Sequence, residues 1–494
     1  MRPPASYLAP VFAHLLDRPD KQAVVMPDGS LSYGELEAAS ASLAAMLPDG
    51  PLALWAAPTV AMIVGLIAAL RAGVALIPVN PKSGTSELEH LLADAAPGAV
   101  LVGAGTQLPH PLAAIPRIDL APPMAHEAGA QGGVNELDEP AEELPALIMY
   151  TSGTTGKPKG VVQSRRSLIA NLDALAEIWE LTHEDVITHS LPLFHVHGLV
   201  LGTIGPLRLG ARVRHLGRFE IESTVCALEA DASVLFGVPT MYHRLAAAAT
   251  EDARVARALS RPRLLASGSA ALSVDTHEQI ARLSGRTVIE RYGMTETMII
   301  SSTRPDQPGR PGYVGTPLPG VSVQVRDELG EQVPRDDQGM GNVWVRGPSV
   351  FREYVNHAHP TAGAFDGEWF DTGDLATVAS DGALRLVGRR STDLIKSGGY
   401  RIAAGEIESA LLSHPAVGEA AVCGLPDAEL GERVVAWVVP AEGTSSGDDE
   451  LIEHVVEQLT PHKRPREIRR VSSLPRNELG KVQKQRLTTS AVQL

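Results

Sequence analysis

The strongest candidate for chemistry in this chain is a loop that concentrates glycine, hydroxyl and lysine side chains, Tyr150-Thr-Ser-Gly-Thr-Thr-Gly-Lys-Pro-Lys-Gly160. Glycine lets a backbone approach a phosphate closely, and hydroxyl and free N–H groups form a cradle for an anion. Lys157 and Lys159 add positive charge. The glycine spacing, with Pro158 directly after the lysine, excludes a Walker A motif. Because a buried strand is expected at residues 146–150, a phosphate-binding loop is favoured over a flexible surface turn.

Two histidines separated by one residue form a second candidate group, within Leu191-Pro-Leu-Phe-His-Val-His-Gly198. A catalytic zinc site needs three protein ligands, and no third ligand stands near His195 and His197 in the sequence. We therefore expect these side chains to gate a pocket or to donate a hydrogen bond to a bound ligand, rather than to hold a metal.

The elements that must position these residues alternate between helix and strand. Residues 24–26 and 31–33 flank Asp28-Gly29, which predicts a hairpin. Residues 52–79 are apolar enough to resemble a membrane span, but prolines, an arginine and a glycine interrupt them, so we expect a strand, a helix over 59–72 and a second strand. Further along the chain we expect a helix over 168–178 and strands over 186–190, 233–236 and 264–267.

The second half of the chain changes character. Short alternating strands at 321–325 and 341–345 predict a small β-rich subdomain, and a compact segment with both helix and strand patterns follows Gly388-Arg389. The predicted fold is α/β. A large N-terminal domain of layered α/β subdomains plus the β-rich subdomain takes residues 1–389, and a small mobile α+β C-terminal domain takes residues 390–494.

Composition excludes several classes of protein. A length of 494 residues calls for more than one core, and a net charge of −15 argues against nucleic-acid binding. The two cysteines, Cys226 and Cys423, cannot form a disulfide framework and fit a reducing compartment. The first ten residues lack the apolar core of a signal peptide. We expect a cytoplasmic protein without a membrane partner, and the sequence assigns no oligomeric state.

Five motifs in order carry a resemblance to a known family. The loop at 150–160 is followed by Tyr292-Gly-Met-Thr-Glu296, Trp369-Phe-Asp-Thr-Gly-Asp-Leu375, Gly388-Arg389 with the run Asp393-Leu-Ile-Lys-Ser-Gly-Gly-Tyr-Arg-Ile402, and Gly480-Lys481. Together they resemble the adenylate-forming superfamily, which includes acyl-CoA synthetases, luciferases and the adenylation domains of peptide synthetases. The resemblance extends over essentially the whole chain and implies an enzyme that activates a carboxylic acid with ATP and passes the acyl group to a thiol.

The resemblance also implies a role for each motif. Tyr292 would stack on adenine, Thr295 would contact the α-phosphate, Glu296 would bind Mg²⁺, Asp374 would hold both ribose hydroxyls, and Lys481 would be the catalytic lysine. Charge neutralisation by a cation and an ammonium suits a reaction between two anions. The loop residues implied to bind ATP, together with Arg389 at the interdomain hinge, are Thr151, Ser152, Gly153, Thr154, Thr155, Gly156, Lys157 and Lys159.

Two parts of these motifs concern the moving domain and the thiol. Gly398 and Gly399 would border the tunnel for the pantetheine arm of coenzyme A, where the absence of a Cβ allows close passage. The hinge departs from the family, because Ser391 stands where aspartate or lysine is usual. Rotation of the two domains stays an expectation, whereas the residue that absorbs the backbone change is left open.

The acid pocket is implied to lie between two further segments, 191–198 and Ser267-Gly-Ser-Ala-Ala-Leu272. We take His195 as a candidate catalytic residue and His197, Ser267, Ser269 and Arg291 as candidate binding residues. Arg291 directly precedes the adenine-stacking tyrosine, and a guanidinium there can pair with a second carboxylate. These segments look most like those of malonyl-CoA synthetases, so we expect malonate or a 2-substituted malonate.

Several alternatives stay open at this point. Arg291 can instead pair with Glu290, Glu296 or a phosphate. The acid can be an ordinary short-chain or aryl monocarboxylate, and the thiol can belong to a carrier protein instead of coenzyme A. A nucleotide-binding regulator without catalysis is a further class, but loss of Lys481 or Glu296 would favour it and both are present.

Overall fold

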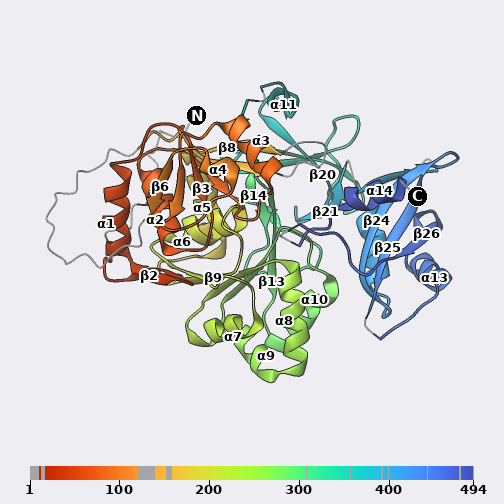
Figure 1. Ribbon diagram of the computed structural model, residues 1–494. Coiled ribbons are helices and arrows are strands. Elements are labelled where there is room, and N and C mark those ends of the chain that lie inside the picture. The colour runs from red at the N-terminus through yellow and green to blue at the C-terminus, as the bar shows by residue number, and fades with distance from the viewer. Residues whose placement is uncertain are drawn as a thin grey trace.

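The computed structural model describes residues 11–12, 17–120, 140–151, 158–307, 309–356, 358–390, 393–398, 400–441, 443–477 and 480–492 of the chain. Figure 1 shows a large body formed by the N-terminal and central parts of the chain, with the C-terminal part as a smaller lobe, coloured blue, at its right. The expected fold class is confirmed: several sheets with flanking helices build the large part, and a separate sheet builds the small one.

The largest sheet contains nine strands within the described residues, in the order β15-β14-β13-β12-β11-β9-β10-β1-β2. Its centre is parallel and its ends are antiparallel. The hairpin predicted around Asp28-Gly29 is confirmed as β1–β2. The bounds are β1 Gln22–Met26, β2 Gly29–Ser32, β9 Val186–His189, β10 Arg212–His215, β11 Val234–Gly237, β12 Leu264–Ser267, β13 Val288–Met294, β14 Met298–Ser302 and β15 Thr316–Pro317.

The second sheet follows the order β18-β8-β7-β4-β3-β5-β6. The apolar stretch 52–79 forms β3, helix α2 (Val60–Arg71) and β4, as predicted. Thr59 caps α2 by accepting a hydrogen bond from the Met62 N–H, and residues 60–70 are all buried, which explains their continuous apolar character. The strand bounds are β3 Leu52–Trp55, β4 Leu76–Val79, β5 Val100–Gly103, β6 Arg117–Leu120, β7 Pro145–Thr151, β8 Lys159–Ser164 and β18 Glu353–Tyr354.

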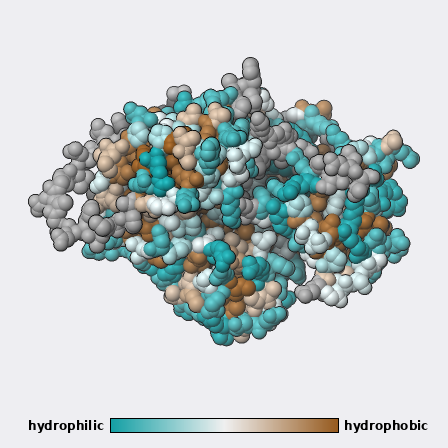
Figure 2. Space-filling view, in the orientation of Figure 1, coloured by the Kyte–Doolittle hydropathy of each residue, from teal (hydrophilic) through white to brown (hydrophobic). Residues whose placement is uncertain are grey.

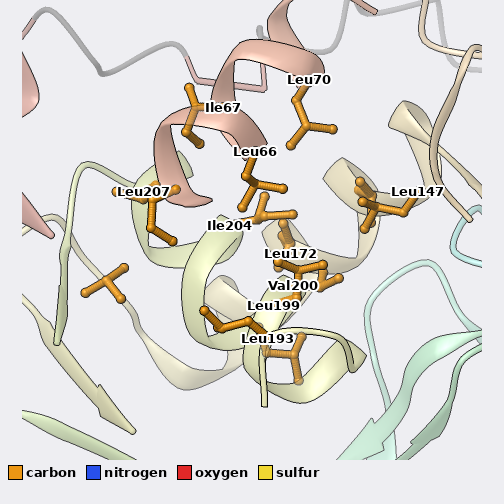
Figure 3. Close-up of a cluster of buried hydrophobic side chains, with 14 of the residues drawn as sticks. Leu66, Ile67, Leu70, Leu147, Leu172, Leu193, Leu199, Val200, Ile204 and Leu207 are labelled. Carbon is orange, nitrogen blue, oxygen red and sulfur yellow. The ribbon is translucent and has the colours of Figure 1, made fainter. Parts of the chain in front are cut away.

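Helices fill the space between the two sheets and cover their outer faces. Side chains of α2, α5 and the π-helix η1 pack with residues of both sheets in the main core, part of which Figure 3 shows. Helices α7 to α10 cover the other face of the nine-stranded sheet, and α3 and α4 cover the other face of the second sheet. The bounds are α1 Tyr33–Ala44, α3 Thr85–Ala95, α4 His110–Ala113, α5 Arg165–Trp179, η1 His197–Ile204, α6 Gly205–Arg208, α7 Ile221–Ala230, α8 Pro239–Glu251, α9 Ala253–Leu259 and α10 Val274–Ser284.

The β-rich subdomain predicted near residue 320 is present. Its sheet has the order β16-β17-β20-β19, with β21 paired to β20, and it packs around a core of its own that includes the ring of Tyr292. This packing joins the subdomain to the end of β13. The bounds are β16 Ser322–Arg326, β17 Gly341–Arg346, α11 Ala358–Gly363, β19 Phe365–Asp366, β20 Trp369–Val378 and β21 Leu384–Arg389.

The C-terminal lobe is built on a sheet in the order β23-β22-β25-β24, with β26 paired to β25. Two small apolar cores lie on its faces, so the lobe has its own hydrophobic support. The domain boundary at residues 389 and 390 stays a prediction. The bounds are β22 Leu394–Ser397, β23 Tyr400–Ala403, α12 Ala404–Leu412, β24 Val417–Asp427, β25 Gly431–Pro440, α13 Asp448–Gln458, the 3₁₀ helix η2 Pro461–Lys463, β26 Glu467–Arg470 and α14 Lys484–Val492.

The surface of the molecule is mostly hydrophilic on the face that is shown. On the face shown in Figure 2, hydrophilic residues cover most of the body and of the C-terminal lobe, and hydrophobic residues occur in small separate groups. Throughout the residues that the structure describes, helices fall short of the length and apolar character needed to cross a bilayer.

Candidate active site

The predicted phosphate loop leaves β7 and returns on β8, two antiparallel strands in which Thr151 lies opposite Lys159. The loop is tied to helix α3 at its first end, because the Tyr150 hydroxyl donates to the Asp94 carboxylate at 2.8 Å. The two strands therefore fix where the loop begins and ends. The loop residues that lie outside the described part of the chain are Ser152, Gly153, Thr154, Thr155, Gly156 and Lys157.

A row of three side chains connects the end of this loop to the predicted magnesium ligand. The Lys159 ammonium lies 5.0 Å from the centre of the Tyr354 ring, and the Tyr354 hydroxyl donates to Glu296 Oε1 at 2.9 Å. Burial raises the pKa of Glu296, and the hydrogen bond from Tyr354 opposes this rise. Sequence reasoning missed Tyr354, which stands outside every motif and reaches the site only because β18 pairs with β8.

The turn that carries Thr295 and Glu296 is held by backbone contacts. Gln163 Nε2 donates to the Thr295 carbonyl at 2.6 Å, and the Phe351 N–H donates to the Glu296 carbonyl at 2.6 Å. Gln163 belongs to β8, the strand that begins at Lys159. One strand therefore positions both the end of the phosphate loop and the Thr295-Glu296 turn.

The predicted ribose and adenine residues form a connected group. Tyr292 OH donates to Asp374 Oδ2 at 2.6 Å, and Arg389 Nε lies 2.9 Å from Asp374 Oδ1. Asp374 and Arg389 are partners in the pairing of β20 with β21. Burial raises the pKa of Asp374, although the Arg389 charge opposes it. Each carboxylate oxygen has two lone pairs, so both oxygens keep an acceptor position for a hydroxyl group.

The structure brings Lys481 to this same group. The Lys481 N–H donates to Asn477 Oδ1 at 2.9 Å in a tight turn, and a Cβ placed on Gly480 would lie 3.2 Å from the Thr240 side chain at the start of α8. Desolvation by the surrounding protein and then the Arg389 charge lower the pKa of Lys481, while the charge of Asp374 raises it. The C-terminal lobe thus delivers a lysine beside the nucleotide residues of the large domain.

Arg291 is buried on β13, with 8% of its surface exposed, and its Nε and Nη2 atoms lack a hydrogen-bond partner among the described residues. Burial lowers the pKa of the guanidinium to about 10. A Cβ placed on Gly268 would lie 2.4 Å from Arg291 Cζ, so a side chain at this position would displace the guanidinium. The guanidinium is therefore held in place by packing, with donors that point at no protein acceptor.

The two carboxylates that were alternative partners of Arg291 are engaged elsewhere. Glu290 accepts from the backbone N–H groups of Leu272, at 3.2 Å, and Gly312, at 3.4 Å. Burial raises the pKa of Glu290 to about 7, and Glu296 accepts from Tyr354. The described chain thus contains neither ion pair, and the phosphate alternative stays open.

The remaining acid-pocket candidates gather on the same side of the sheet. Ser269 Oγ lies 3.5 Å from His197 Nδ1, the His197 and Phe236 ring centres are 5.8 Å apart, and the buried Ser267 hydroxyl has no partner among the described residues. Burial, followed by the Arg291 charge, lowers the pKa of His197, and burial lowers the pKa of His195 to about 4. Both rings are neutral at neutral pH.

The residues predicted for the thiol tunnel are only partly described. Gly398 adopts a left-handed backbone with φ of 58°, and its N–H donates to the Leu430 carbonyl at 2.9 Å. The predictions for Gly399 and for the hinge at Ser391 lie outside the described residues.

Comparison with known proteins identifies the family of this chain. The family model described as AMP-binding enzyme matches residues 12–355, and its C-terminal domain matches residues 406–481. The mitochondrial malonate–CoA ligase of Mus musculus is 35% identical over 97% of this chain and 90% of its own length. A sulfoacetate–CoA ligase of Cupriavidus necator is 34% identical over 96% of this chain and 95% of its own length.

Two solved structures show the same relationship. A malonyl-CoA ligase in a ternary product complex with methylmalonyl-CoA and AMP is 49% identical, with a TM-score of 0.72, over 96% of this chain and all of the other. ATP-bound MatB from Rhodopseudomonas palustris is 34% identical, with a TM-score of 0.88, over 97% of this chain and 98% of the other. The fold and site define an adenylate-forming acyl-CoA ligase. The chain belongs to the AMP-binding enzyme family.

Proposed function

We propose that this enzyme converts malonate, or a 2-substituted malonate, to its coenzyme A thioester through an acyl-adenylate. The observation that carries the proposal is the buried Arg291 guanidinium, whose Nε and Nη2 have no acceptor in the part of the chain that the structure describes. Burying a charge without a partner is costly, and a carboxylate of the substrate would supply the missing partner. The only carboxylate of a monocarboxylate takes part in the reaction, whereas malonate has a second carboxylate that can pair with the arginine.

Neutral groups around the arginine support an anionic ligand. His197 is uncharged at neutral pH because of burial and of the nearby Arg291, so it adds a hydrogen-bonding group without repelling the guanidinium. Ser267 and Ser269 add hydroxyl groups. The sum is one fixed positive charge surrounded by neutral polar groups, which suits one spare carboxylate.

In the first step, a carboxylate oxygen of the acid attacks the α-phosphorus of ATP and pyrophosphate leaves. Two anions must approach each other, so positive charge at the meeting point lowers the barrier. Lys481 lies beside Asp374 and Arg389 and would supply it, and Thr295 and Lys159 would contact the phosphates. Arg291 holds the second carboxylate away from the α-phosphate.

Glu296 fits the role of magnesium ligand. Its buried carboxylate has a neutral hydroxyl as its side-chain partner and no cation in hydrogen-bonding contact among the described residues. A site with one carboxylate is usual for Mg²⁺, which takes its other ligands from water and substrate phosphates. When bound, the ion would neutralise phosphate charge.

In the second step, the thiol sulfur attacks the acyl carbon, the bond to the phosphate oxygen breaks, and AMP leaves while the thiol loses its proton. Lys481 has no part in this step, and we infer that the C-terminal lobe rotates to remove it and to bring Gly398 and Gly399 to the thiol. One site can run both steps in this way.

Other acids are separate candidates. The sulfoacetate–CoA ligase relative suggests sulfoacetate, because a sulfonate can also satisfy Arg291. Short-chain monocarboxylates and aryl acids would leave the guanidinium unpaired, and a carrier-protein thiol would replace only the second substrate. The cytoplasmic location also stays a prediction, since a relative is mitochondrial.

A panel of acids tests the proposal. The purified protein is assayed for ATP–pyrophosphate exchange and for thioester formation with malonate, methylmalonate, sulfoacetate, oxalate, butyrate and benzoate, with coenzyme A or a carrier protein as acceptor. We expect the highest kcat/KM with malonate or methylmalonate and with coenzyme A. A higher value for butyrate or benzoate would refute the dicarboxylate proposal, and a higher value for sulfoacetate would change the acid while keeping the role of Arg291.

A further inference from the structure

A second lysine lies three residues after Lys481 and forms a partly buried cluster of its own. Lys484 Nζ lies 2.5 Å from Asp393 Oδ1 and 2.7 Å from Glu408 Oε1. The exposed fractions of the three side chains are 15%, 19% and 22%. No motif in the sequence drew attention to Lys484, and the two reaction steps described above do not use it.

Both carboxylates of the cluster are fixed to the backbone. Asp393 Oδ2 accepts from the Arg389 N–H at 2.8 Å, and the Arg389 carbonyl accepts from the Asp393 N–H at 2.8 Å. Glu408, on α12, accepts from the Val422 N–H at 2.7 Å. Burial is the largest single influence on the pKa of Asp393 and acts to raise it, but the charge and hydrogen bond of Lys484, the Arg389 N–H and the Lys481 charge together hold that pKa below its usual value.

These contacts form one continuous connection from the catalytic lysine to the nucleotide site. Lys484 begins α14 directly after the turn that bears Lys481. Its partner Asp393 is bonded to the backbone of Arg389 across the predicted hinge. The Arg389 guanidinium in turn holds Asp374 at 2.9 Å. A shift of α14 would therefore displace Lys481 relative to Asp374.

We propose that Lys484 is a positioning residue for adenylate formation: it fastens the Lys481 segment to the hinge carboxylate Asp393 and so sets the Lys481 ammonium against the nucleotide residues. Lys484 does not itself touch the reacting atoms, because two carboxylates occupy its ammonium. The inference rests on the proposed role of Lys481. It adds that a partly buried ion-pair cluster holds the hinge and the catalytic lysine in fixed relative positions.

The test separates the two half-reactions in the full-length enzyme. Lys484→Met, Lys484→Arg and Lys481→Ala are compared with wild type for ATP–pyrophosphate exchange, using the best acid of the panel, and for thioester formation from supplied acyl-adenylate and coenzyme A. Displacement of a catalytic group by about 1 Å costs up to about 100-fold in rate. We expect Lys484→Met to lose about 10- to 100-fold in exchange and less than about threefold in thioester formation, and Lys484→Arg to recover most of the loss.

Lys463→Met is the matched control for exchange. Lys463 also pairs with a glutamate of α12, Glu406, but among the described residues Glu406 makes no hydrogen bond or ion pair with the hinge carboxylate Asp393. We expect its exchange rate to stay near that of wild type. Because Lys484→Met leaves two carboxylates without their cation, the double variant Lys484→Met/Glu408→Gln is measured as well. It removes one of the two unpaired charges and is expected to show the same selective loss.

The outcomes distinguish the role of Lys484 from that of Lys481. Equal losses in both half-reactions for both Lys484 variants would mean that the cluster only stabilises the lobe, and no loss in exchange would mean that it positions nothing. If Lys481→Ala loses exchange, either result overturns the inference about Lys484 and leaves the proposed role of Lys481 standing. If Lys481→Ala keeps exchange, the proposed role of Lys481 fails and the role of Lys484 fails with it.

Discussion

Arg291 and Tyr292 are neighbours on β13 and serve different parts of the site. Successive side chains of a strand point to opposite faces of the sheet. Tyr292 accordingly packs into the core of the β-rich subdomain and bonds to Asp374, while Arg291 lies against Gly268 and near His197. In the proposed mechanism, two consecutive residues thus bring the nucleotide group and the acid group to one strand end, where a carboxylate would meet an α-phosphate.

Arg291→Leu tests whether this residue selects a second carboxylate. Removing one partner of a buried, hydrogen-bonded charge pair costs roughly 2–5 kcal/mol, or about 30- to 4000-fold. We expect kcat/KM for malonate to fall by such a factor, while kcat/KM for butyrate holds or rises because butyrate has no charge to pair. The ratio of the two acids is the measurement, since any loss of support for Tyr292 lowers both. Equal falls would place Arg291 on the nucleotide side.

The sequence predicts Arg291 because it adjoins a motif, and it cannot predict Tyr354 for a physical reason. Tyr354 reaches Glu296 through the pairing of a two-residue strand, β18, with β8. That pairing joins segments nearly two hundred residues apart and leaves no local pattern. The sequence also cannot predict that Arg291 has donors without a partner, because Glu290 and Glu296 are candidate partners in the sequence. Only the structure shows that both carboxylates accept hydrogen bonds from other groups.

At the scale of elements, the π-helix η1 sets the position of the acid-pocket histidines. Two buried histidines hold the segment that leads into it. His189 accepts from the Leu191 N–H at 3.3 Å, and the His215 ring lies 3.0 Å from the Leu191 carbonyl. His189 also contacts the Gly202 carbonyl at 3.1 Å, inside η1. The same pair of rings therefore fixes the entry and the middle of the segment that carries His195 and His197.

Gly202→Ala tests this clamp. The added Cβ would lie 2.7 Å from His189 Nε2, so the ring or the helix must move, at a cost of about 1–3 kcal/mol in folding stability. We expect KM for the acid to rise by about tenfold, while KM for ATP changes less than about twofold. Gly98→Ala is the control, because a Cβ there meets nothing within 4 Å. Parallel rises in both KM values would show that η1 supports the whole site and not the acid pocket.

Most of the elements follow from local patterns, but η1 does not. The apolar residues 199–204 suit any buried helix. The wider turn depends on close contacts, since a Cβ on Gly198 would lie 2.3 Å from the Pro192 carbonyl oxygen. The helix also packs with α2 and α5 in the main core, as the labelled side chains in Figure 3 illustrate. The periodicity of the sequence therefore predicts a helix here, but it does not distinguish a π-helix from an α-helix.

At the scale of the molecule, the position of the C-terminal lobe is the feature that sequence leaves undetermined. Motif order predicts a lobe that carries Lys481, but the contact of the Gly480 turn with Thr240 depends on how the lobe is oriented. In the structure this orientation sets Lys481 beside Asp374 and Arg389, as the proposed adenylation step requires.

A disulfide between this turn and α8 would hold the lobe in that orientation. A Cβ placed on Gly480 lies 3.8 Å from Thr240 Cβ, a separation that suits a disulfide. The variant Thr240→Cys/Gly480→Cys is made in a Cys226→Ser background, because Cys226 is exposed whereas Cys423 is buried. Gly480 has a φ of 76°, so the substitution adds backbone strain of about 1 kcal/mol, which the fold can tolerate.

In the oxidised variant, we expect ATP–pyrophosphate exchange to continue at a rate near that of the reduced form, because Lys481 stays beside Asp374 and Arg389. Thioester formation should fall by at least about 100-fold, because the second step requires the lobe to rotate. Adding a reductant should restore it. The two single-cysteine variants, treated with the same oxidant, control for damage to other groups and should keep both activities. If the oxidised double variant forms thioester at the reduced rate, the lobe need not move, and one arrangement of the two domains serves both half-reactions.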